Sequence, residues 1–229
     1  MLDMDNCGVV IMKTKIVTGD VHGDFGALND LISKKKKHGL ELVICCGDFG
    51  FWPQGPDQVI KGIKNQGVKI LFCDGNHENH HALRDRKSDE IVPNVFYMPR
   101  GSTYKLDDGR NILFMGGADS IDKQWRTPGF DWFPEELVTQ RDIENLPDEK
   151  VDIFITHTCP KELLPDMIEV DYRKKYDPSN HYLSELWKIY KPSLHYFGHW
   201  HTYKTGVLMG TRWYCLNMSR HTNFWRWLD

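Results

Sequence analysis

The chain has 229 residues, of which 40% are hydrophobic and 27% are charged, a composition that is ordinary for a folded globular protein. Its formal net charge of −3 gives no whole-chain attraction to nucleic acid or to anionic membranes, so long nucleic-acid substrates are not expected. No apolar stretch approaches the ~20 residues that a membrane-spanning helix needs, and we expect no association with a membrane.

The first half of the chain alternates apolar runs with helical patterns. Strands are predicted at residues 15–18, 40–46 and 68–73. One helix is predicted over residues 25–37, and a second is expected to begin at Asp57 and end at Gly67. This alternation indicates crossover units and a parallel sheet, in which functional side chains gather at the carboxyl ends of the strands.

The second half is more varied. One hairpin is predicted at the beginning of this half and another near its end. Helices are expected near residues 134–145 and over residues 184–191. The hairpin strands are residues 102–106 with 111–115, and 205–209 with 212–216. No internal repeat or low-complexity linker interrupts the chain, so we expect a single domain over residues 1–229.

The cysteines and the N-terminal residues favour a reducing compartment. The six cysteines form no C-x-x-C pair, which argues against a thiolate zinc site. Cys45, Cys46 and Cys73 stand inside apolar runs, where cysteine usually packs as a small hydrophobic residue. The first ten residues hold two Asp and no basic residue, unlike a secretory signal peptide. We therefore expect a cytoplasmic location.

Five short apolar runs each end in side chains that can bind a metal ion. The runs are followed by Asp20 with His22, Gly47-Asp48, Gly75-Asn76-His77-Glu78, Thr156-His157, and Gly198-His199-Trp200-His201. Each motif alone is weak evidence, but their common position after apolar runs predicts one cluster at the rim of a sheet. The cluster has carboxylate, amide and imidazole groups without thiolate, a mixture that can hold two divalent first-row metal ions.

This series of signatures resembles the calcineurin-like metallophosphoesterase superfamily, from residue 15 to about residue 205. The resemblance implies an α/β fold of two packed mixed β-sheets flanked by helices, a four-layer sandwich. It also implies two metal sites that share Asp48, and a His77 that faces the substrate as general acid or transition-state stabiliser. The implied ligands are Asp20, His22, Asp48 and His201 for one ion, and Asp48, Asn76, His157 and His199 for the other.

The residues alone are consistent with that chemistry. Two neighbouring ions can lower the pKa of a shared water and clamp the oxygens of an in-line displacement at phosphorus, so the attacking group would be a metal-bridging hydroxide. Asp20 and Asp48 neutralise only half the charge of two divalent ions, so the site stays positive and attracts phosphate. We expect manganese, with iron, zinc or nickel as alternatives.

Two departures from the family pattern bear on the substrate. Thr156 stands where the fourth signature often has glycine. Serine/threonine phosphatases of the superfamily carry an arginine after the residue equivalent to Asp48, whereas this chain continues with Phe49-Gly50-Phe51-Trp52. We therefore expect a phosphodiesterase or nucleotide phosphohydrolase that acts on a small phosphate ester or nucleotide. The alternatives are a serine/threonine-type protein phosphatase and a metal-stabilised binding module without turnover, and the oligomeric state stays open.

Several other polar residues have simpler interpretations. We expect His195 in the core, His80 and His81 at the surface of a helix start, and the lysines at 34–37 at a solvated helix end. Glu78 is a candidate acceptor for a ligand imidazole. Three arginines are expected at the surface, with the binding of a substrate phosphate as the alternative: Arg100, Arg126 and Arg220.

Overall fold

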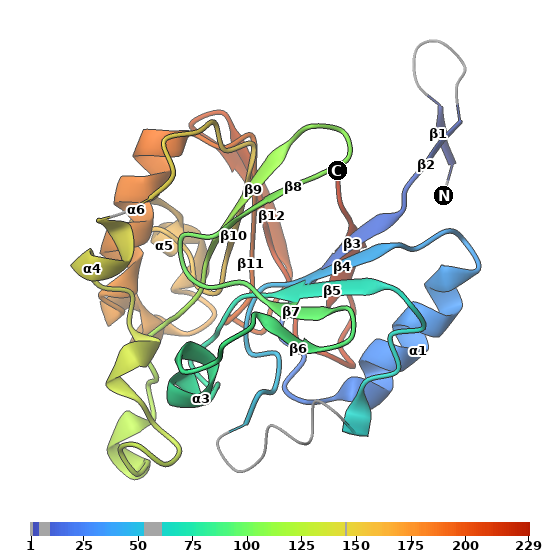
Figure 1. The fold of residues 1–229 in the computed structure, drawn as a ribbon. Coiled ribbons are helices and arrows are strands. Elements are labelled where there is room, and N and C mark those ends of the chain that lie inside the picture. The colour runs from blue at the N-terminus through green and yellow to red at the C-terminus, as the bar shows by residue number, and fades with distance from the viewer. Residues whose placement is uncertain (1, 5–9, 53–60, 145) are drawn as a thin grey trace.

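The computed structural model describes residues 2–4, 10–52, 61–144 and 146–229, and within them two six-stranded mixed sheets pack face to face (Figure 1). Helix α1, Phe25–Lys36, covers the outer face of one sheet, and helix α6, Ser179–Tyr190, covers the outer face of the other. The layers therefore run helix, sheet, sheet, helix, which confirms the predicted fold class.

The first sheet has the strand order β14-β3-β4-β5-β7-β6. Strands β3, β4, β5 and β7 run parallel, and the two edge strands are antiparallel to their neighbours. The bounds are β3 Lys15–Thr18, β4 Leu42–Cys45, β5 Lys69–Phe72, β6 Glu90–Val92, β7 Val95–Tyr97 and β14 Trp225–Trp227. The three predicted strands of the first half are confirmed as this parallel block.

The second sheet has the order β12-β13-β11-β10-β9-β8, and its four central strands are also parallel. The bounds are β8 Thr103–Lys105, β9 Asn111–Met115, β10 Ile153–Thr156, β11 Leu194–Phe197, β12 Lys204–Leu208 and β13 Thr211–Cys215. Both predicted hairpins are confirmed, as the antiparallel pairs β8 with β9 and β12 with β13.

The period of two along the strands explains why these runs are apolar throughout. Val17, Ile44 and Leu71 are paired across β3, β4 and β5, and all three face the core between the sheets. The preceding residue of each strand faces the opposite way, toward the buried side of α1. A strand that is covered on both faces needs no polar positions, so it reads as a continuous apolar run.

The remaining described elements are short. Strands β1, Leu2–Met4, and β2, Val10–Met12, form a separate two-stranded sheet. The short helices are α3 His80–Arg84, α4 Gln140–Ile143 and α5 Leu164–Met167, and the 3-10 turns are η1 Lys123–Trp125, η2 Pro134–Glu136, η3 Lys161–Leu163 and η4 Tyr172–Tyr176. Within the described residues, no helix has the combination of length and apolar character that a membrane crossing would require.

Two helix predictions need correction. The continuous helix expected near residues 134–145 is wrong, because the guanidinium of Arg100 donates hydrogen bonds to the backbone oxygens of Glu135, Glu136 and Leu137. The chain there forms η2 and α4 with extended residues between them. Helix α6 begins at Ser179, earlier than predicted. The expected helix start at Asp57 lies outside the described residues.

Candidate metal centre

The seven predicted ligands follow the carboxyl ends of five parallel strands. Strands β3, β4 and β5 of the first sheet and β10 and β11 of the second carry them. Asp20 and His22 follow β3, Asp48 follows β4, Asn76 follows β5, His157 directly follows β10, and His199 and His201 follow β11. Because parallel strands end at the same edge, five distant segments converge at one place, as the motif positions predict.

The backbone at these positions is unusual. Four of the seven residues have a positive φ, a conformation that costs free energy in a residue with a side chain. The angles are 50° at His22, 45° at Asp48, 65° at His199 and 48° at His201. Such strain persists only where the surrounding structure fixes it, and it tends to gather at functional sites.

Glycines in the motifs make room for the carboxylates. A Cβ added at Gly75 would overlap Oδ1 and the backbone nitrogen of Asp48, and a Cβ at Gly198 would overlap Oδ1 of Asp20. The glycines of two motifs are thus required by the acidic residues of two others. These close approaches explain why glycine, which carries no functional group, stands at positions 75 and 198.

Asp20, His22 and His201 form the first group. His201 Nε2 lies 3.0 Å from Asp20 Oδ2, and His22 Nε2 lies 3.6 Å from the same oxygen. The two imidazole nitrogens are 3.1 Å apart. A second carboxylate, that of Asp48, places Oδ2 3.6 Å from His22 Nε2. The ligand atoms of Asp20, His22 and His201 lie within 4.8 Å of one another, close enough for a single cation to contact all three.

Asn76, His157 and His199 form the second group. Asn76 Oδ1 lies 3.0 Å from His157 Nε2 and 3.1 Å from His199 Nδ1. Asp48 Oδ1 lies 3.5 Å from His157 Nε2. The two oxygens of Asp48 therefore face different groups, Oδ2 toward His22 and Oδ1 toward His157. This carboxylate stands between the two groups, where a bridging ligand would have to be.

Hydrogen bonds to residues outside the two groups fix the orientation of His157 and Asn76 in the second group. His157 Nδ1 lies 2.9 Å from the backbone oxygen of Cys46 and donates to it, which leaves the Nε2 lone pair directed at the site. The amide nitrogen of Asn76 donates to Ser120 Oγ at 2.9 Å, and Ser120 in turn donates to Glu136 at 2.8 Å. These contacts point the amide oxygen of Asn76 toward the histidines. Neither Ser120 nor Glu136 was predicted from the sequence.

Glu78 has a different role from the one expected. Its two oxygens accept hydrogen bonds from the backbone nitrogens of Gly50 and Gly75, at 3.0 and 2.5 Å, rather than from a ligand imidazole. It thereby ties the loop after β4 to the loop after β5. Burial, together with the nearby charge of Asp48, raises the pKa of the Glu78 carboxyl to about 8.

The carboxylates of the site stay ionised. Burial alone would raise the pKa of Asp20, but hydrogen bonds from His201 and His22 outweigh it and lower that pKa well below its ordinary value. Burial is likewise outweighed at Asp48, where the nearby histidines His157, His77 and His22 lower the pKa. Burial lowers the pKa of His199 well below 6.5, which keeps its imidazole neutral.

This donor set suits divalent first-row ions. Buried carboxylates with imidazole lone pairs and an amide oxygen are ligands for such ions, and Asp20 and Asp48 are both almost completely buried. Two histidine nitrogens 3.1 Å apart beside a carboxylate are explained by a shared cation more readily than by hydrogen bonds alone. The residues therefore fit the group that the motifs imply.

His77 lies beside the two groups rather than within them. Its Nε2 is 3.9 Å from Asp48 Oδ2, and its backbone nitrogen donates to Asp48 Oδ1 at 3.0 Å. Its side chain lines a cavity of about 260 Å³ together with Asp48, Asn76, His199 and His201. Burial, together with the charge of Arg126, lowers the pKa of His77 below 6.5. His77 is thus placed to meet a molecule that enters the cavity.

The loops after β9 and after β10 supply the rest of the cavity wall. Arg126 and Asp122 come from the first loop, and Arg173, Lys174 and Asp171 come from the second. Lys174 was missed by sequence reasoning, because it stands in a polar stretch without a motif. Trp52 stands at the edge of the site, with its ring stacked 6.2 Å from that of His22. The remainder of that aromatic segment, from Pro53 on, lies outside the described residues.

Several other residues singled out in the sequence are buried. His195 is buried, as predicted, and so is the set of free cysteines 45, 46 and 73. The surface prediction for His80 is wrong, since it is only 1% exposed and its Nδ1 lies 3.7 Å from Asp74 Oδ2. Arg100 is also buried, in ion pairs with Asp74 and Asp142.

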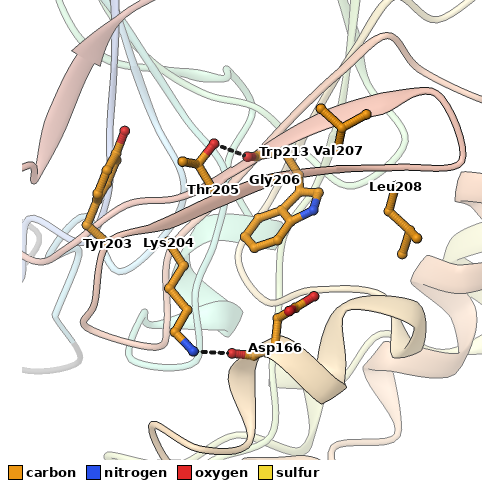
Figure 2. Close-up of a pocket in the computed structure, with 8 residues that line it drawn as sticks. All are labelled: Asp166, Tyr203, Lys204, Thr205, Gly206, Val207, Leu208 and Trp213. Carbon is orange, nitrogen blue, oxygen red and sulfur yellow. Dashed lines mark hydrogen bonds between the residues drawn. The ribbon is translucent and has the colours of Figure 1, made fainter.

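A larger hollow, of about 430 Å³, lies along β12, and none of the seven predicted ligands lines it (Figure 2). Its wall includes the ring of Trp213, which packs against Gly206. The Nζ of Lys204 donates to the backbone oxygen of Asp166 (Figure 2). Its lysine is already engaged, and neither group of metal-binding side chains found among the described residues lines it, so this hollow offers less chemistry than the smaller cavity at His77.

Comparisons with known proteins agree with this geometry. A family model described as calcineurin-like phosphoesterase matches residues 14–203. CWF19-like protein 1 of Mus musculus is 23% identical over 153 residues, covering 64% of this chain and 28% of that protein. Lariat debranching enzyme A of Xenopus laevis is 24% identical over 180 residues, covering 64% of this chain and 33% of that protein. The chain thus spans about a third of the length of these curated relatives.

A solved structure shows the same fold. The crystal structure of TT1561 of Thermus thermophilus matches with a TM-score of 0.60 and 14% identity, covering 91% of this chain and 90% of that one. At this identity the likeness concerns the fold alone. The family model, in contrast, spans all five strand-end motifs. The chain therefore belongs to the calcineurin-like phosphoesterase family.

Proposed function

We propose that this protein is a dinuclear metal-dependent phosphoesterase, with a phosphodiester or a nucleotide as its substrate. The observation that carries the proposal is the placement of Asp48, whose Oδ2 is 3.6 Å from His22 Nε2 and whose Oδ1 is 3.5 Å from His157 Nε2. A carboxylate between two groups of metal-binding side chains is what two adjacent cations need, because its charge offsets their mutual repulsion. Family membership places the chain among phosphoester hydrolases.

The seven ligands would divide into two sets that share Asp48. Asp20, His22 and His201 would hold one ion, and Asn76, His157 and His199 the other. When bound, the two ions would lower the pKa of a water molecule between them and clamp the phosphoryl oxygens for in-line attack. We propose manganese first, with iron, zinc or nickel as alternatives, because imidazole, amide and carboxylate donors accept all four.

The chain's own residues supply the remaining steps. His77 lines the cavity with its Nε2 near Asp48, so it can hydrogen-bond a phosphoryl oxygen or protonate the leaving oxygen. Asn76 contributes an oxygen without adding negative charge, so the site remains attractive to an anion. The Asn76–Ser120–Glu136 chain holds that oxygen in place. The reaction proposed is hydrolysis, in which water replaces an alcohol on phosphorus and the alcohol leaves with a proton.

An aromatic wall supports a substrate with a planar organic group. Trp52 is half-buried beside His22 and has a ring contact with His77 at 6.3 Å, so its ring borders the site. Aromatic side chains stack on nucleobases and aryl groups. We propose a nucleotide or an aryl-like diester over a phosphoprotein on this ground, and because an arginine is missing directly after Asp48.

The test is a matrix of metals against substrates on chelator-stripped protein. We expect manganese to restore hydrolysis of a bis-aryl phosphate diester and of nucleotides, with slower turnover of a phosphopeptide. A lariat substrate belongs in the matrix because of the name of the Xenopus laevis relative. Faster turnover of the phosphopeptide would contradict the substrate assignment. Full metal loading without hydrolysis of any ester would contradict the enzyme assignment.

A further inference from the structure

Arg126 enters the cavity from the loop that follows β9. It stands directly after the 3-10 turn η1, and its side chain is only 11% exposed, although its neighbour Trp125 is 76% exposed. Its Nη2 donates to Asp122 at 2.8 Å and lies 3.2 Å from His77 Nε2. A guanidinium is therefore held against the one histidine that lines the site without belonging to either ligand group.

Three cationic side chains line this cavity, and they differ in what already engages them. Lys174 donates to the backbone oxygen of His199 and lies over the ring of Trp200. Arg173 is 58% exposed and forms two hydrogen bonds to Asp171, through Nε and Nη2. Within the described part of the chain, the hydrogen bonds of the Arg126 side chain are made by Nη2 alone, which leaves its Nε and Nη1 donors for a ligand.

The loop that carries Arg126 is anchored to the metal centre at its base. The backbone nitrogen of Gly117 donates to the backbone oxygen of Asp74 at 2.9 Å. Ser120 accepts a hydrogen bond from Asn76 and is itself bonded to the buried Glu136. The base of the loop is thus tied to the segment after β5 that also carries Asn76 and His77. This connection fixes the position of the loop, and with it of Arg126, relative to the site.

We propose that Arg126 binds a non-bridging oxygen of the substrate's phosphoryl group beside His77, with Asp122 as its positioning residue. This inference rests on the proposed function. Arginine presents planar, paired donors that match the oxygens of a phosphate. The chain thereby obtains from the loop after β9 the guanidinium that the sequence lacks directly after Asp48. In the sequence Arg126 was only one of three candidate arginines, and about 78 residues of chain separate it from Asp48.

The experiment measures the binding of inorganic phosphate to manganese-loaded protein by calorimetry, without any turnover. Arg126→Gln should weaken phosphate binding about 10- to 100-fold, the usual worth of a hydrogen bond to a charged group. Arg126→Lys should fall between the two, because it keeps the charge but loses the planar fork. Lys123→Gln is the matched control, since it removes one positive charge from the same loop at a side chain that pairs with Asp119 outside the cavity.

Two outcomes overturn the inference. One is equal phosphate affinity in Arg126→Gln and Lys123→Gln, provided both keep the wild-type metal content and melting temperature. The other is no binding of phosphate by the wild-type protein. Arg126-dependent phosphate binding by a wild-type protein that hydrolyses no ester would support this inference while contradicting the proposed function, so the two failures are distinguishable.

Discussion

At the scale of single residues, Asp48 and His77 carry different parts of the account. Asp48 is buried and faces both histidine groups, whereas His77 is nearly a third exposed and faces the cavity. The resemblance to the family implied these different roles for Asp48 and His77. The motifs did not predict that Arg126, which donates to Asp122, would lie 3.2 Å from His77 Nε2, because both residues belong to a loop without a recognisable pattern.

His77→Ala should separate catalysis from metal binding. We expect kcat to fall roughly 10²- to 10⁴-fold, the usual contribution of a positioned acid or base, with metal content unchanged. Steady-state kinetics and elemental analysis on the same sample provide the two readouts. His81→Ala is the matched control, because His81 is exposed and contacts Glu135. Loss of metal from His77→Ala would show that His77 is a ligand.

At the scale of elements, strand β11 connects the buried core to the metal centre. His195 lies in this strand, 2.8 Å by its Nε2 from Thr156 Oγ1, and Thr156 in turn donates to the backbone oxygen of Thr158. The threonine that replaces the family's usual glycine before His157 therefore links β10 to β11. The substitution is visible in the sequence, but only the paired strands show what its hydroxyl does.

Burial of His195 should make the protein sensitive to acid. Burial lowers the pKa of this imidazole to about 3, from an ordinary value of 6.5. Between those two pH values the unfolded chain binds a proton that the folded chain does not, so stability falls as the pH falls below 6.5. The loss approaches ~1.4 kcal/mol per pH unit for one such group.

Replacing His195 by glutamine should reduce that sensitivity. Glutamine keeps an amide donor for Thr156 but binds no proton, so the free energy of unfolding should decline less between pH 6.5 and 5 than in the wild-type protein, by roughly 1.6 kcal/mol. Urea unfolding of both proteins at the two pH values measures the difference between the slopes, which is independent of any constant cost of the substitution. Parallel slopes would mean that His195 does not contribute to the acid sensitivity.

The same scale shows the limits of sequence patterns. The apolar runs of β3, β4 and β5 were predictable, because strands buried on both faces are apolar throughout. The break between η2 and α4 was not, since it depends on Arg100 binding three carbonyl groups from a distant part of the chain. Tertiary contacts of this kind override local helix patterns.

At the scale of the whole molecule, the fold is the device that assembles the site. Two parallel blocks, one in each sheet, end on a common rim, so the predicted ligands from residues 20 to 201 meet there. The residue types and their order after apolar runs were sufficient to predict a parallel sheet with a cluster of metal-binding side chains at its rim, whereas the two packed sheets and the set of seven ligands were implied by the resemblance to the family. The complete lining of the cavity was not predictable, because Lys174 lies in the 3-10 turn η4 and Arg126 directly follows η1, in stretches without a recognisable motif.

The central claim is that Asp48 joins two metal ions, and the most direct test is anomalous diffraction from crystals of the protein grown with manganese. The account predicts two peaks about 3.5–4 Å apart, one on each side of the Asp48 carboxylate. The first should contact His22 and His201, and the second His157 and His199. No peak at Asp48, or a single ion that contacts only one of the two histidine pairs, would contradict the account.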